Sequence, residues 1–147
     1  MGRLDLLTSL YPRILIPPAV HVEVTRRGTG ALVFAQATWL IVRSPKDVED
    51  VSRLRGVANL DPGESEAIVL AGELGARLIL DENEGRQIAR ARGIPFSGTI
   101  GLVVEAARAG FIAIDDVEPL LRQMVRARFR VSERLIRHAV ALVRAGR

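Results

Sequence analysis

The chain has 147 residues and a formal net charge of +4; 48% of its residues are hydrophobic and 26% are charged, a composition that is typical of globular proteins and excludes disorder. It contains no cysteine and only two histidines, which excludes a disulfide framework, a cysteine nucleophile and a zinc site built from these residues. The longest uncharged run, residues 28–42, is too short to cross a membrane, so we expect a soluble, cytoplasmic protein with a single domain over residues 1–147.

Short apolar segments alternate with segments of helical periodicity. The predicted elements are a helical stretch over residues 2–11, a strand over 13–16, a helix over 19–27, a strand over 39–42, helices over 46–55 and 61–73, a strand over 77–80, a helix over 85–92, a strand over 94–96, and helices over 100–109, 117–127 and 133–145. The valines at 20, 22 and 24 also alternate as in a strand. Strands separated by helices imply a parallel α/β sheet with its ligands at the carboxyl ends of the strands.

Three predicted helices have recognisable boundary residues. Asp61, Pro62 and Glu64 have the spacing of an N-cap, a first helical residue and a capping-box glutamate, and Gly75 closes the same helix. Toward the C-terminus, Asp115 or Asp116 is expected to cap the helix over 117–127. Ser132 is expected to cap the final helix.

Positive charge is concentrated at the C-terminal end. Residues 122–147 contain eight arginines and a single acid, Glu133. Such a block can bind a polyanion through its phosphates. The alternative is a solvated face of arginine-rich helices, and the charge pattern supports both interpretations about equally.

Acidic residues gather directly after the strand over 77–80. Asp81, Glu82 and Glu84 fall within four residues, together with Asn83. Carboxylates at the end of a buried strand repel one another unless a cation is bound, and oxygen ligands suit Mg²⁺ or Mn²⁺. The alternative is that Asp81 or Asn83 caps the next helix while the glutamates favour its positive dipole.

Three further acids have structural alternatives of their own. Glu64 can serve as a metal ligand or simply complete its capping box. Glu66 is two residues away on another helix face, so only one of the two is expected to reach a site. For Glu23, the alternative is a solvated acid on the protein surface.

Four motifs together resemble the PIN-domain superfamily, and within it the prokaryotic VapC-like branch of predicted nucleic-acid-binding proteins. They are residues 14–20 with Glu23, residues 60–68, residues 80–82 followed by Gly85 and Arg86, and residues 98–101. The resemblance covers nearly the whole chain. It implies a three-layer α/β/α sandwich with a short parallel sheet. It also implies a ribonuclease that depends on Mg²⁺ or Mn²⁺ and is often paired with an antitoxin.

The resemblance assigns roles to individual residues. Glu64 and Asp81 match catalytic metal ligands of the family, Glu82 lies close to a further acid, and Glu23 falls where this branch has an acid after its second strand. Bound cations would activate water and stabilise charge on the scissile phosphate. The arginines expected to hold the RNA backbone are Arg86, Arg122, Arg126 and Arg130.

The beginning of the chain departs from the family pattern. Family members begin with a central strand that ends in an aspartate, whereas the first residues here resemble the helix that follows it, with Asp5 in the helical stretch. The first family strand is therefore expected to be missing, and catalysis requires that its acid be supplied. Unpaired strand edges favour a homodimer. The predicted function is a VapC-type endoribonuclease, and the alternative is an inactive module that binds nucleic acid or protein.

Overall fold

A computed structural model describes residues 10–11, 13–26, 38–57, 60–126 and 133–145, without the side chains of 23–26, 57, 124–126 and 133–135. The chain forms two compact units, which we describe separately: one is Arg13–Ser97, and the other combines Met1–Pro12 with Gly98–Arg147. The expected single domain stays a prediction.

The unit Arg13–Ser97 contains two pairs of parallel strands. Strand β1 (Ile14–Ile16) pairs with β2 (Leu40–Val42), with Leu15 opposite Ile41. Strand β3 (Leu78–Ile79) pairs with β4 (Phe96–Ser97), with Leu78 opposite Phe96. The helices of this unit are α2 (Pro18–Arg26), α4 (Val48–Val57), α5 (Pro62–Leu74) and α6 (Asn83–Ala91). The expected parallel α/β architecture is confirmed, including the strand over 13–16 and the helix over 19–27.

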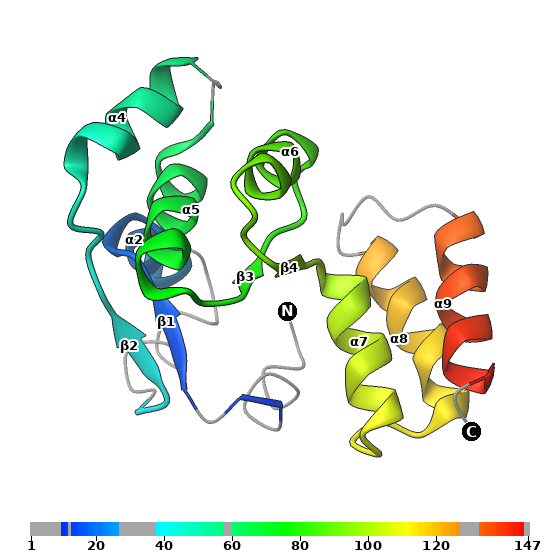
Figure 1. Cartoon of the computed structure of the whole chain (residues 1–147). Helices are drawn as coiled ribbons and strands as arrows, with labels where there is room; N and C mark the ends of the chain where they lie inside the picture. Colours follow the sequence, from blue (N-terminus) through cyan, green and yellow to red (C-terminus); the bar gives the residue numbers. More distant parts are fainter. Residues whose placement is uncertain (1–9, 12, 27–37, 58–59, 127–132, 146–147) are drawn as a thin grey trace. The chain divides into compact units, whose positions relative to one another are not determined.

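Helix α5 packs against α2, α4 and α6 and lies among them in Figure 1. Its N-cap is Asp61 and its C-cap is Gly75, which has a φ of 62°, as the boundary residues predict. Buried apolar residues join it to the strands: Ile68, Val69, Leu78, Leu80 and Ile94 belong to one core cluster.

Two glutamates of α5 bind the amino-terminal ends of its neighbours. Glu66 Oε2 accepts a hydrogen bond from the Ala19 N–H of α2 at 3.0 Å. Glu73 accepts two from the Lys46 N–H before α4, at 2.6 and 2.9 Å, and one from the Asp47 N–H at 3.2 Å. Because helix N-termini carry partial positive charge, these carboxylates fix α2 and α4 on α5.

The second unit is helical in its described part. Helices α7 (Thr99–Arg108), α8 (Ile114–Arg126) and α9 (Glu133–Ala145) lie side by side in Figure 1 and share one core. The residues of this core that are at most 2% exposed are Ala106, Val117, Leu121, Ile136, Ala139 and Val143. The Tyr11 hydroxyl donates to Glu105 at 3.2 Å and ties the N-terminal segment to α7.

Three predicted helix starts are wrong. Helix α4 begins at Val48, two residues after the predicted position. Helix α8 begins at Ile114, so Asp115 and Asp116 lie in its first turn, where they favour the helix dipole instead of capping it. Ile114 packs against the core of this unit, which accounts for the earlier start. Helix α6 begins at Asn83, two residues before the predicted position. The helical stretch over residues 2–9 and the Ser132 cap lie outside the described residues.

The α/β fold class and the short parallel sheets are as expected, with seven helices in the described residues. None of these seven is both long and apolar enough to pass through a lipid bilayer.

Candidate active site

Glu64 occupies the first turn of α5 and uses one oxygen for the capping box. The Asp61 Oδ1 accepts a hydrogen bond from the Glu64 N–H at 2.7 Å, and Glu64 Oε2 accepts one from the Asp61 N–H at 3.4 Å. The second bond is long. The other oxygen, Oε1, is buried and has no hydrogen-bond partner among the described residues. The capping box therefore leaves half of this carboxylate without an explanation.

The electrostatic surroundings of Glu64 disfavour its negative charge. Burial is the main cause that raises the pKa of Glu64, and the negative charges of Asp61, Glu82 and Glu84 raise it further. The hydrogen bond from the Asp61 backbone opposes them. Because Glu82 and Glu84 act on a residue of α5, the fold brings the two predicted acidic stretches to one place.

The fold positions the acidic turn by a close contact between β3 and α6. A Cβ on Gly85 would lie 2.7 Å from Leu80 Cδ2, so only glycine lets the first turn of α6 approach this buried leucine without displacement. The Leu80 N–H donates to the Ser97 carbonyl at 2.9 Å, which extends the β3 and β4 pairing to the edge of the turn. These contacts place Asp81, Glu82 and Glu84 at the carboxyl end of β3, as the parallel-sheet rule predicts.

Asp81 lies in an exposed position beside Arg86. Its side chain is 46% exposed, and its Oδ1 is 3.8 Å from Arg86 Nη2, a separation at which the charges attract without a hydrogen bond. Arg86 Nε donates to the Leu80 carbonyl at 2.9 Å. Arg86 is thus anchored to the backbone directly before Asp81. The contact with RNA that the sequence predicts for Arg86 stays a prediction.

The structural alternative for the acidic turn is wrong in one respect. Neither Asp81 nor Asn83 caps α6; the N-cap is Glu82, and its side chain makes no capping hydrogen bond. Glu84 lies in the first turn and also raises the pKa of Glu64, a proximity that its sequence position did not reveal.

The remaining predicted residues fall elsewhere. Glu23 belongs to α2, and its side chain lies outside the described residues, as do the Arg126 side chain and Arg130. Arg122 of α8 forms an ion pair with Glu118 at 2.7 Å, which engages part of its guanidinium. The metal-binding and RNA-binding roles assigned to these residues stay predictions.

A model of the PIN domain family matches residues 1–145. The chain belongs to the PIN-domain family. Searches of curated proteins and of solved structures each found no significant match. The match supports the superfamily resemblance and a nuclease-like fold for this PIN domain, together with the general use of divalent metals in the family.

The donor set of this PIN domain suits a hard cation. Glu64 Oε1 is a buried oxygen without a partner in the part of the chain described, and the carboxylates that approach it supply negative charge. No group of three or more acidic, histidine or cysteine side chains is close enough to hold an ion among the described residues. Mg²⁺ is commonly held by one or two carboxylates, with water and substrate phosphate completing its shell. The residues present therefore fit such an ion.

Proposed function

We propose that this PIN domain is a metal-dependent endoribonuclease that hydrolyses RNA phosphodiester bonds. The observation that carries the proposal is the buried Oε1 of Glu64, which has no partner in the described residues and is close to the charges of Glu82 and Glu84. Burying an acceptor without a partner is costly, and adding two carboxylates increases that cost. A bound cation removes both costs at once.

The proposed roles follow from where each group lies. Glu64 and Asp81 are the proposed ligands of Mg²⁺ or Mn²⁺, and Glu82 and Glu23 of α2 are further candidates. When bound, the ion supplies charge stabilisation at the phosphate and lowers the pKa of water. Arg86, anchored on the Leu80 carbonyl, keeps the turn that carries Asp81 in place and offers its remaining N–H donors to a phosphate oxygen.

The finer assignments are part of the same proposal. A VapC-type toxin would act in the cytoplasm, pair with an antitoxin protein and associate as a homodimer. Arg122, Arg126 and Arg130 would add contacts to the RNA backbone that contribute affinity without reading sequence.

A second candidate function is binding of nucleic acid without cleavage. The observation that favours it is the lack of a three-ligand group among the residues described. In that case the carboxylates would bind a cation weakly or not at all, and the arginines would remain functional.

The decisive test combines cleavage with metal-dependent stability. We expect RNA cleavage in Mn²⁺ by a chain to which the acid of the first family strand is supplied. Glu64→Gln and Asp81→Asn should abolish that cleavage, because each removes a charged ligand. Mn²⁺ at about one hundred times its Kd should stabilise the wild type by about 2.7 kcal/mol and each variant less. The control is Glu49→Gln, an exposed carboxylate of α4. Equal Mn²⁺ stabilisation of all four proteins would refute the metal site.

A further inference from the structure

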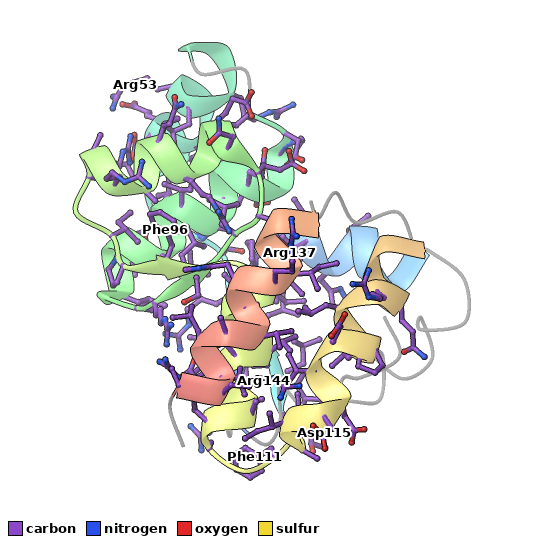
Figure 2. The ribbon with its side chains drawn as sticks, turned by 90° about the vertical axis from the view of Figure 1, so that its right-hand side faces the viewer. Arg53, Phe96, Phe111, Asp115, Arg137 and Arg144 are labelled. Atoms are coloured by element: carbon purple, nitrogen blue, oxygen red, sulfur yellow. The ribbon has the colours of Figure 1, made fainter. Side chains whose placement is uncertain are left out.

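Two arginines of α6 lie over the same aromatic ring. The guanidinium carbon of Arg86 is 5.8 Å from the centroid of the Phe96 ring, and that of Arg90 is 5.5 Å from it. Both distances are within the range of cation–π attraction. Because the arginines are four residues apart, they project from the same face of the helix. Phe96, which is labelled in Figure 2, comes from β4. The ring thus fixes two positive charges about one helical turn apart.

Arg90 differs from its neighbours in lacking an acidic partner within the described part of the chain. Arg92, two residues later, forms a bidentate pair with Asp50 at 2.7 and 2.9 Å. Arg86 lies near Asp81. Arg90 is exposed, and its interaction is with the Phe96 ring. When an exposed guanidinium is held by an aromatic ring and not by a carboxylate, no negative group compensates its charge. Its N–H donors are then available to an anion.

The two arginines lie on the helix that begins at the acidic turn. Arg86 donates to the Leu80 carbonyl, directly before Asp81, and Arg90 lies one turn farther along α6. The positive charges therefore extend away from the acidic turn on a single element. A polyanion whose phosphate reaches the acidic turn can continue over Arg86 and Arg90.

We infer that Arg86, Arg90 and Phe96 form a contact surface for the backbone of single-stranded RNA next to the candidate active site. The inference rests on the proposed function and names the part of the chain that holds the substrate. An acidic peptide would also satisfy two arginines. However, the adjacent carboxylates are the proposed ligands of a cation that binds phosphate, and an aromatic ring beside arginines is typical of single-strand binding.

Binding in EDTA tests the surface without requiring cleavage. We would measure the affinity of a fluorescent single-stranded RNA over a range of salt concentrations for the wild type and Arg90→Gln. Losing one phosphate contact should weaken binding several-fold and reduce the slope of log affinity against log salt by about 0.7. The matched control is Arg55→Gln, which removes another exposed arginine, from the last turn of α4.

Phe96→Leu tests whether the ring matters in addition to the charges of the two arginines. Both arginines remain, so the salt slope should be unchanged, while affinity falls about two- to five-fold because the guanidinium groups lose the ring. Circular dichroism would show that each variant is folded. An unchanged slope in Arg90→Gln, the same change in Arg55→Gln, or equal competition by polyglutamate would each overturn the inference.

The outcomes distinguish this surface from the enzyme proposal. If the wild type cleaves RNA and Arg90→Gln binds normally, the RNA lies elsewhere and the nuclease remains. If Arg90→Gln loses affinity with the expected slope and no cleavage is seen with Mn²⁺ even when the acid of the first family strand is supplied, the surface is supported and the protein is a binding module.

Discussion

The two oxygens of the Glu64 carboxylate lie in different surroundings. Its Oε2 completes the capping box, while its Oε1 is buried without a partner among the residues described. Glu66 and Glu73, on the same helix, use their carboxylates to bind backbone N–H groups at the starts of α2 and α4. Among these three glutamates, Glu64 is thus the one whose placement costs stability.

This cost predicts the pH dependence of a Glu64→Gln variant. Because the pKa of Glu64 is raised in the folded state, the folded chain binds more protons than the unfolded chain just above the ordinary pKa of glutamate, so wild-type stability falls as pH rises there. Glutamine keeps the capping pattern and does not titrate. The variant should melt higher than the wild type at pH 7, with the difference disappearing at acid pH. Thermal melts across this range check it; a constant difference contradicts it.

Ser65 carries a second buried polar atom without a partner in the described region. The residue is 0% exposed, and its Oγ makes no hydrogen bond to any described group. Ser65→Ala removes the unsatisfied hydroxyl and improves helix propensity, so we expect stabilisation of about 1 kcal/mol. Chemical denaturation measures this. A loss of stability would show that the hydroxyl has a partner.

Among the elements, the junction of β3 and α6 depends on one glycine. An added Cβ at Gly85 would overlap Leu80, which is buried, so Gly85→Ala should cost about 1–3 kcal/mol and shift the acidic turn. A Cβ added at Gly56 in α4 would meet no described atom within 4 Å. Gly56→Ala should therefore stabilise the chain by about 0.4–1 kcal/mol. Opposite signs in urea denaturation confirm the contrast, and equal effects refute it.

The attachment of α4 to α6 depends on the ion pair between Asp50 and Arg92. Arg92 lowers the pKa of Asp50 through hydrogen bonding, so this stabilisation exists above the ordinary pKa of aspartate and is lost as pH falls. Arg92→Gln should cost about 1–2 kcal/mol at pH 7. Arg53 pairs with the same carboxylate but is 64% exposed, so Arg53→Gln should cost less than about 0.5 kcal/mol. Equal losses would contradict the bidentate pair as the main link.

Local signals predicted some elements better than others. The capping box at Asp61 and the left-handed Gly75 are properties of a few adjacent residues, so α5 was predicted to within a residue. The start of α8 depends on the packing of Ile114 against residues distant in sequence, and the Asp115 signal was misleading. The proximity of Glu84 to Glu64 likewise depends on the Gly85 contact. Arg90 had the right spacing from Arg86, but the shared ring of Phe96 could not be predicted from the chain.

The connectivity of the two units bears on how the entire chain unfolds. The unit with α7, α8 and α9 takes its residues from both sides of Arg13–Ser97, and Tyr11 and Leu10 join its helical part. When Arg13–Ser97 is unfolded, bringing these two segments together closes a long flexible loop, which costs entropy. Folding of the inserted unit reduces that cost. The stability of one unit is therefore expected to support the other.

This coupling predicts one cooperative transition for the chain. Ile68→Ala in the core around α5 and Leu121→Ala in the core of α8 both truncate side chains that are 0% exposed, and each should cost about 2–5 kcal/mol. Each should lower the midpoint of the same calorimetric transition, with equal calorimetric and van't Hoff enthalpies. Two separate transitions, each sensitive to only one substitution, would show that the units unfold independently and that the expected single domain is wrong.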